Sequence, residues 1–232
     1  MPEKQAKKMN VLLVISDQHI AACMGNEGHP QAITPNMDHL AEMGVRFSNA
    51  YTQNPICTPS RISILSGQYC HNHGYYGLSG PTPMGLPNLF EHYQNNGYRT
   101  AGIGKLHLPT TPQYWGEAHM DLFADSYLNE QGRPSPYYTY LEELGLRDRE
   151  DSVELPEFPG RQQHEGRPSM LPYEHSVEGW CVQQATRFID GILAHQDQMI
   201  CFLNLEELFS ANGPSGGGYS GGGGSDPGWE EF

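Results

Sequence analysis

Three short runs of apolar residues constrain the fold of this chain more than any other feature. They are "VLLVIS" (11–16), "YRTAGIG" (98–104) and "MICFLNL" (199–205). Short runs rich in branched apolar residues are typical of strands that are covered on both faces, as in a parallel sheet. Helical segments separate the three runs. This alternation predicts an α/β fold, a layered α/β sandwich with a mostly parallel central sheet.

Start and stop signals place helices between these strands. Pro35 stands at a first helical position after a Thr34 cap, and Gly44 and Gly67 stand where helices are expected to end. Residues 45–52 are predicted to be extended. The predicted helices are residues 35–43, 59–66, 86–97 and 175–196. In the last of these, apolar residues recur at helical spacing and form one stripe: Val177, Cys181, Ala185, Phe188 and Ile192.

Composition divides the chain into three parts. Residues 1–8 are expected to be a disordered N-terminal extension, and residues 9–205 to form one globular unit. Within that unit, residues 109–174 are rich in Pro, Tyr and Gly, and we expect a loop-rich insertion in which only "YLEELG" is helical. Residues 206–232 are a Gly/Ser-rich flexible tail, which cannot bury a core.

Charge and cysteine content exclude several classes of function. The formal net charge is −14, so we expect neither nucleic acid nor a membrane as a partner. Five cysteines at irregular spacing, with no CxxC pair, indicate reduced thiols rather than a zinc finger or a disulfide framework. The N-terminal apolar run is too short for a signal peptide. We therefore expect a cytoplasmic protein, or a periplasmic or secreted one if the N-terminus was processed.

The segment "NPICTPSRISILSG" (54–67) contains the first candidate for chemistry. Cys57 is expected at the entry of a helix, where unpaired backbone N–H groups and the helix dipole favour negative charge. Arg61 is expected to point back toward the same place. The pattern predicts a pocket for a tetrahedral anion with a nucleophile at its rim. The alternative is a small buried cysteine at the start of an ordinary helix.

Two strand ends supply further candidates. Asp17 follows the first strand, at the edge where open α/β sheets bind ligands, and a carboxylate there suits a hard divalent cation. Lys105 and His107, in "GKLHL", follow the second strand at alternating positions, so both side chains can face one side. The alternatives are a loop aspartate that caps a turn, and a solvated strand end with a partly buried histidine.

His71 and His73, in "YCHNHG", have a spacing that metal ligands also use. We interpret them instead as part of a turn near the site, with His73 as a residue that can line the pocket. Aromatic residues in the loops can shape a substrate pocket or pack against the core: Tyr75, Tyr76, Tyr114 and Trp115.

Four linked segments resemble the sulfatase family. "CTPSRISILSG" is similar to its C-x-P-S-R signature, and "NVLLVISDQH" to its first strand with a metal-binding acidic end. "TPNMDHLAEMGVRFSNAYTQNPICTPSR" resembles its run from the first helix to the active-site cysteine, and "NLFEHYQNNGYRTAGIGKLHL" a later helix–strand unit. The resemblance covers residues 9–205. It implies the N-terminal part of a sulfatase catalytic domain with an alkaline-phosphatase-like fold, which is expected to be truncated here.

The resemblance implies roles for individual residues. Cys57 occupies the position of the cysteine that a formylglycine-generating enzyme oxidises to formylglycine, whose hydrated aldehyde attacks the sulfur of a sulfate ester. Arg61 resembles the arginine that holds the hydrate, Lys105 the lysine that bridges sulfate and nucleophile, and His107 the histidine that contacts the hydrate. The implied metal ligands are Asp17, Gln18 and the modified Cys57, for Ca²⁺ in the first place, or for Mg²⁺ or Mn²⁺.

The implied function is hydrolysis of a sulfate monoester on a small molecule or a carbohydrate. Gln18 replaces a second aspartate of many members and also occurs in relatives that act on phosphonates, so a phosphonate or phosphate monoester hydrolase is one alternative. Family members also supply a later Pro-His pair, an Asp-Asn or Asp-His pair and a second lysine, which residues 206–232 do not contain. We therefore expect weak metal binding and weak or absent activity of this chain alone. The other alternative is a non-catalytic fragment or interaction protein, with an exposed sheet edge at which an oligomer can form.

Overall fold

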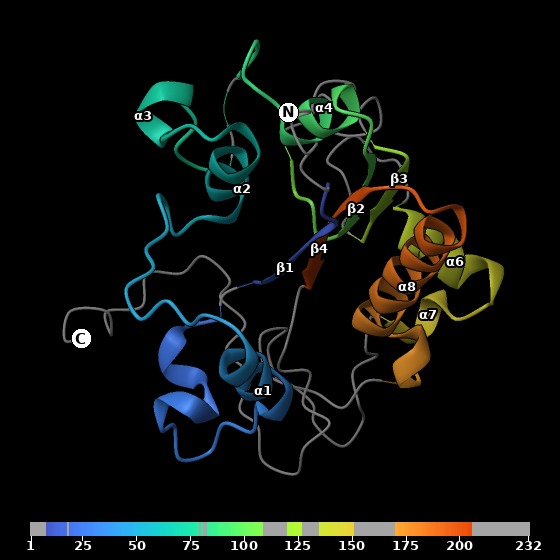
Figure 1. Cartoon of the computed structure of the whole chain (residues 1–232). Helices are drawn as coiled ribbons and strands as arrows, with labels where there is room; N and C mark the ends of the chain where they lie inside the picture. The colour runs from blue at the N-terminus through green and yellow to red at the C-terminus, as the bar shows by residue number, and fades with distance from the viewer. Residues whose placement is uncertain are drawn as a thin grey trace, which may run out of the picture.

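A parallel four-stranded sheet forms the centre of the structure (Figure 1). The computed structural model describes residues 8–17, 19–78, 80, 83–108, 120–126, 135–150 and 170–205. The strands lie in the order β1-β4-β2-β3, and all neighbouring strands are parallel. Their bounds are β1 Val11–Ser16, β2 Arg99–Gly104, β3 Leu122–Asp125 and β4 Met199–Leu205. The predicted α/β class with a parallel central sheet is confirmed.

Helices lie on both sides of this sheet, with α6, α7 and α8 on one side and α2, α3 and α4 on the other (Figure 1). The bounds of the helices are α1 Pro35–Met43, α2 Cys57–Ser66, α3 Cys70–His73, α4 Leu89–Asn95, α6 Pro136–Glu143, α7 Arg147–Glu150 and α8 Val177–His195. Short 3-10 turns are η1 Ala21–Cys23, η2 Gly25–Glu27 and η4 Tyr173–His175. In the described part of the chain, no helix is both long and apolar enough to span a membrane.

β4 is one of the two inner strands, and its sequence follows from its position. It pairs with β1 on one side and β2 on the other, and its residues 199–204 are all buried. A strand covered on both faces has no solvent side, so its apolar run is nearly continuous. β1 lies at the edge of the sheet, and there Leu12 and Val14 stay 48% and 53% exposed.

The first core lies between the sheet and α8. The predicted stripe of α8 faces this core: Cys181, Ala185 and Ile192 are buried, and Val177 and Phe188 pack against them. Trp180 of the same helix stacks at a tilt against Tyr137 of α6, with 5.4 Å between the ring centroids. The helix predicted for this segment is confirmed. Its apolar residues lie on one side of the helix, and that side packs against the sheet.

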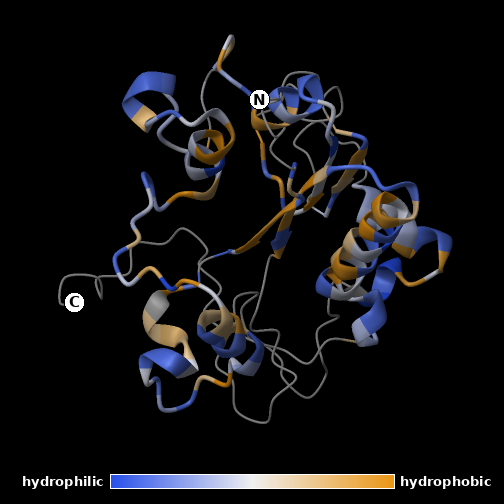
Figure 2. Ribbon diagram, in the orientation of Figure 1, coloured by the Kyte–Doolittle hydropathy of each residue, from blue (hydrophilic) through white to orange (hydrophobic). Residues whose placement is uncertain are grey.

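The second core lies on the opposite face and anchors the helix that carries Cys57. Ile62 and Leu65 of α2 are buried there together with Phe90 of α4 and Phe202 of β4. The rings of Phe90 and Phe202 meet edge to face at 6.2 Å. Figure 2 shows the apolar strands in the middle of the molecule, with α8 on one side and α2 and α4 on the other. This packing fixes α2 against the sheet.

The segment 19–56 packs differently from the rest. None of its residues whose side chains are described is buried. Leu40 and Met43 of α1 are 64% and 65% exposed, and hydrogen bonds and an ion pair replace a core. The Thr34 hydroxyl donates to Asp38 at 3.0 Å, and Arg46 pairs with Glu27.

Several local predictions need correction. β3 and α7 form inside residues 109–174, which we expected to be a loop-rich insertion, so part of that region completes the sheet. The helix expected at "YLEELG" is present as α6, but it begins earlier, at Pro136. α2 begins at Cys57 rather than Pro59. Pro59 lies within the first turn, where a helix makes no internal hydrogen bond from its N–H groups, so the missing N–H of proline costs nothing. The Thr34 side chain does not cap α1. Residues 45–52 form no strand.

The expected N-terminal extension, apart from Lys8, and the expected tail 206–232 lie outside the described residues. Tyr114 and Trp115 also lie outside them.

Candidate active site

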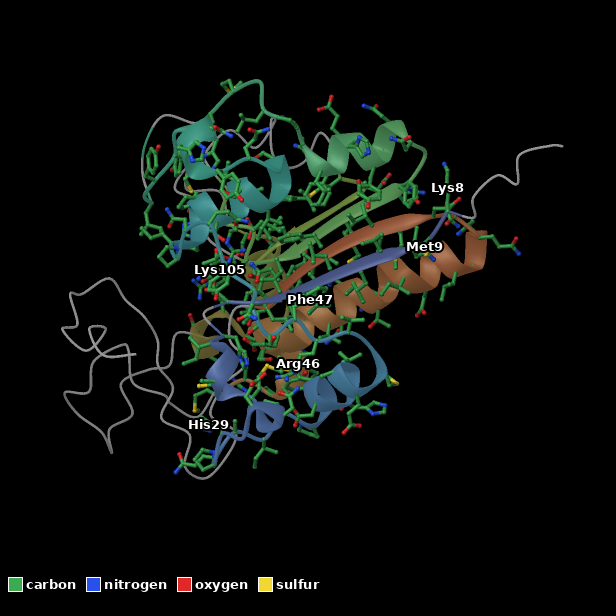
Figure 3. The ribbon with its side chains drawn as sticks, turned by 60° about the vertical axis from the view of Figure 1, so that its left-hand side comes forward. Lys8, Met9, His29, Arg46, Phe47 and Lys105 are labelled. Atoms are coloured by element: carbon green, nitrogen blue, oxygen red, sulfur yellow. The ribbon has the colours of Figure 1, made fainter. Side chains whose placement is uncertain are left out.

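The carboxyl ends of the parallel strands bring the candidate residues to one edge of the sheet. Asp17 follows β1, and Lys105 and His107 follow β2. Cys57 and Arg61 come from the first and second turns of α2. Figure 3 shows Lys105 at the opposite end of the sheet from Lys8 and Met9, which precede β1. Gln18, the remaining candidate, lies outside the described residues.

Asp17 lies between two cations at this edge. Its Oδ2 is 2.9 Å from Nη2 of Arg61 and 3.1 Å from Nζ of Lys105. The side chains of Arg61 and Asp17 are only 6% and 11% exposed, so salt and water screen this attraction little. Burial lowers the pKa of Arg61, and the charge of Asp17 counters that shift. Arginine stays protonated in proteins, so Arg61 offers a fixed positive charge to a ligand.

One donor of Arg61 has no acceptor among the residues that the structure describes. Its Nε is buried and has no hydrogen-bond partner within the described part of the chain. A buried donor without a partner carries a free-energy cost, and such a group indicates a ligand, an ion or a water that completes the site. The Nε–H of Arg61 can therefore donate to one further acceptor, such as an oxyanion.

Cys57 and His107 are in direct contact. The Sγ of Cys57 lies 3.1 Å from Nδ1 of His107. Burial, followed by the charges of Lys105 and Arg61, lowers the pKa of His107 to about 4. The imidazole is therefore neutral at neutral pH, and Nδ1 can either accept a proton from position 57 or donate one to it.

The N-terminus of α2 adds main-chain donors beside Cys57. The residue that precedes the helix, Ile56, has no side-chain oxygen and makes no capping hydrogen bond to it. The first N–H groups of a helix have no partner within the helix. These groups favour an anion next to Cys57, together with the dipole of the ten-residue helix.

The predicted metal site is incomplete among the described residues. Of its three predicted ligands, Asp17 and Cys57 are described, and Oδ2 of Asp17 is already paired with two cations. No group of three or more His, Cys, Asp or Glu side chains that could hold a metal occurs in the described ranges. A hard divalent cation needs about six oxygen ligands. These residues alone do not fit a calcium-type ion.

The histidines 71 and 73 lie on the short helix α3. Tyr75 N–H donates to Nδ1 of His73 at 3.1 Å, so the opposite nitrogen, Nε2, carries the proton and lies 3.0 Å from Ser63 Oγ. Burial, and then His71, lower the pKa of His73. This is a neutral histidine that joins α3 to α2. Tyr75 belongs to the second core, whereas Tyr76 is 58% exposed.

Sequence reasoning missed two polar residues that contact the segment after β2. Asn204 Nδ2 donates to the carbonyl oxygen of Lys105 at 2.7 Å, and Asp125 Oδ1 accepts from Leu106 N–H at 3.2 Å. Asn204 is fully buried. The available signal was the asparagine itself, a polar residue in the otherwise apolar run "MICFLNL".

Comparison with known proteins gives a consistent result. The model of the family described as Sulfatase matches residues 9–157. An N-acetylglucosamine-6-O-sulfatase of Bacteroides thetaiotaomicron is 34% identical over 132 residues, which cover 56% of this chain and 23% of that protein.

Two solved structures share the fold. The phosphonate monoester hydrolase SpPMH of Silicibacter pomeroyi matches with a TM-score of 0.69 and 22% identity, over 87% of this chain and 42% of that one. BT4656 in complex with its substrate D-glucosamine-2-N,6-O-disulfate matches with a TM-score of 0.58 and 22% identity, over 85% and 34%. The chain spans about a quarter of the length of the curated relatives it matches, with 23% and 27% of two of them covered.

Proposed function

Because this chain belongs to the sulfatase family, we propose that it acts in the hydrolysis of a sulfate monoester, with Cys57 as the source of the nucleophile. The observation that carries the proposal is the contact of Cys57 with His107, 3.1 Å apart, beside two cations that share Asp17. A nucleophile, a proton acceptor and cationic donors within one site are the parts that transfer of an anionic group requires.

The mechanism that we propose uses these residues in distinct roles. Once a formylglycine-generating enzyme has oxidised it, Cys57 would supply the nucleophile. Arg61 and Lys105 hold sulfate oxygens by charge-assisted hydrogen bonds. His107, neutral because its pKa is about 4, accepts a proton at Nδ1 from the group at position 57. The main-chain N–H groups at the start of α2 orient the anion.

Maturation and metal binding complete the proposal. A formylglycine-generating enzyme would have to act on "CTPSR" (57–61). A divalent cation, Ca²⁺ before Mg²⁺ or Mn²⁺, stays an expectation from the family with Asp17 as its first ligand, and we assign it no step because the described residues do not complete its site. Residues 9–205 are proposed to be the N-terminal part of the catalytic domain.

The proposed substrate class is a sulfated carbohydrate or a small sulfate ester. One structural relative was solved with a disulfated glucosamine, which favours a sugar. Specificity in such folds comes from loops around the site. Activity on an aryl sulfate would test the chemistry without assuming the natural substrate.

The experiment combines mass spectrometry with hydrolysis. The chain is produced together with a formylglycine-generating enzyme, and the peptide that contains Cys57 is analysed for conversion to formylglycine. Release of 4-nitrophenol from 4-nitrophenyl sulfate is then measured with and without added Ca²⁺, next to the variant Cys57→Ala and the matched control Cys23→Ala. Conversion with turnover that only Cys57→Ala abolishes supports the proposal. A persistent thiol, or equal turnover by both variants, contradicts it.

Gln18 favours a second candidate, hydrolysis of a phosphonate or phosphate monoester. Rates on paired aryl sulfate and aryl phosphonate substrates separate the two candidates. Faster cleavage of the phosphonate would overturn the assignment to sulfate. Calorimetric titration with Ca²⁺ addresses the non-catalytic alternative, which predicts no binding and no turnover.

A further inference from the structure

The turn that follows β2 has an unfavourable backbone conformation, which contacts with neighbouring residues must stabilise. Gly104 has φ of +88° and His107 has φ of +41°, and both lie in the left-handed region. A histidine adopts this region rarely and at a free-energy cost, so such a residue persists only where neighbouring groups hold it. This turn carries Lys105 and His107, the two candidate residues that follow β2.

Asn204, the next-to-last residue of β4, holds this turn at two points. The N–H of Lys105 donates to the main-chain oxygen of Asn204 at 3.2 Å. The side-chain Nδ2 of Asn204 donates back to the carbonyl oxygen of Lys105 at 2.7 Å. A Cβ on Gly104 would lie 1.8 Å from the main-chain oxygen of Asn204, so glycine is required for this close approach. Asn204 thus forms hydrogen bonds with both the N–H and the carbonyl oxygen of Lys105.

The carbonyl oxygen of Lys105 connects Asn204 to the rest of the site. Arg61 Nη1 also donates to the oxygen of Lys105, while Arg61 Nη2 binds Asp17. Asn204 is 0% exposed, and its Oδ1 is buried without a hydrogen-bond partner in the described part of the chain. Burial of a polar side chain that satisfies only its donor opposes folding. This unfavourable burial occurs near the end of β4, where Asn204 contacts Lys105.

We infer that Asn204 is a positioning residue, whose side-chain amide fixes the turn 104–107 so that His107 meets Cys57 and Lys105 meets Asp17. The inference rests on the proposed function, because that function gives Lys105 and His107 their roles. Asn204 itself does not touch the reacting atoms. It acts through the main chain of Lys105.

Two local readouts test this inference on the whole chain with Cys57 kept as a free thiol. The first is hydrogen exchange of the peptide covering residues 104–108, whose amides at Lys105 and Leu106 are hydrogen-bonded. The second is the alkylation rate of Cys57 by iodoacetamide, measured at one fixed pH in the wild-type chain and in each variant, so that the ratio of the rates reports the change at this sulfur. The other cysteines are internal references: Cys23 is partly exposed, and Cys70, Cys181 and Cys201 are buried.

The variants are Asn204→Ala and the milder Asn204→Ser, with Asn88→Ala as the matched control. Asn88 is also buried, and its Oδ1 accepts from the N–H of Phe90 at the start of α4. In Asn204→Ala we expect exchange at 104–108 and alkylation of Cys57 each to rise about fivefold, the equilibrium value of one net hydrogen bond. The buried cysteines stay unreactive. In Asn88→Ala both readouts keep their wild-type values, while exchange rises at the start of α4.

Four results would overturn the inference. They are unchanged exchange at 104–108 in a folded Asn204 variant, faster exchange there without any change at Cys57, a parallel rise at Cys201, and rapid exchange of the 104–108 peptide in the wild-type chain. The last result needs no variant, so it decides the matter even if neither substitution folds. None of the readouts requires turnover, metal or formylglycine. An inactive chain can therefore support the positioning role, and an active chain can refute it.

Discussion

Removal of the Asp17 carboxylate tests the ion cluster at the strand ends. In Asp17→Ala, the buried guanidinium of Arg61 loses its partner at 2.9 Å, and Lys105 loses a partner at 3.1 Å. Removal of one partner from a buried ion pair costs about 3–5 kcal/mol of unfolding free energy. The Lys105 side chain, 17% exposed, can turn toward water, whereas Arg61 at 6% cannot. We therefore expect the lower end, about 3 kcal/mol.

The assay is urea unfolding followed by circular dichroism. With m of about 1–3 kcal/mol/M, a loss of this size lowers the midpoint by roughly 1 M or more. Arg99→Ala is the matched control, because it breaks two ion pairs, to Asp121 and Asp197, whose members are 25–51% exposed, and an exposed pair contributes about 0–1 kcal/mol.

A double substitution identifies the cause of the loss. If the cost comes from an unpaired charge, Asp17→Ala combined with Arg61→Met destabilises less than the sum of the two single changes. An Asp17→Ala midpoint equal to that of Arg99→Ala, or additive effects in the double variant, would refute the reasoning.

Three further predictions concern the packing around the site. Phe202→Ala should cost about 3–5 kcal/mol in urea unfolding, because Phe202 is 1% exposed and packs against Phe90; a loss below 1 kcal/mol would contradict the second core. Gly104→Ala should destabilise far more than Gly145→Ala, since both have positive φ but only position 104 places the new Cβ against backbone, and equal midpoints would exclude the close approach to β4. His73→Gln should flatten the fall in unfolding free energy between about pH 7 and pH 5. Burial lowers the pKa of His73 in the folded chain, so on acidification the unfolded chain binds a proton that the folded chain does not, and stability that is present above the unfolded pKa is lost. An unchanged slope in the variant would show that His73 titrates normally.

The sequence predicted those parts of the fold that have strong periodicity. The stripe of α8 and the apolar runs of β1, β2 and β4 were sufficient for the class of fold, because each pattern leaves one face or no face for water. β3 escaped prediction since its four residues, "LFAD", lie within a Pro- and Tyr-rich region and are too short for a pattern. Its partner β2 determines it, through contacts distant in sequence.

The candidate site was predictable to a similar degree. Asp17, Lys105 and His107 follow predicted strands, and parallel strands bring their carboxyl ends to one edge. The hydrogen bonds between Asn204 and Lys105 were not predictable. They depend on which strands are neighbours, and on the left-handed Gly104, which permits the close approach of Asn204. The ion pair of Arg61 with Asp17 likewise depends on how α2 packs through Ile62 and Leu65.

The lack of any buried side chain among the described residues of segment 19–56 separates the stability of this segment from that of the site. Asp17 is held by the pairing of β1 with β4, and Cys57 by the packing of α2, so both ends of the segment are anchored independently of its middle. Trypsin should therefore cleave after Arg46, which is 45% exposed, well before it attacks the sheet. The two pieces should stay associated after this cut, with the cluster of Asp17, Arg61 and Lys105 intact across a nicked chain.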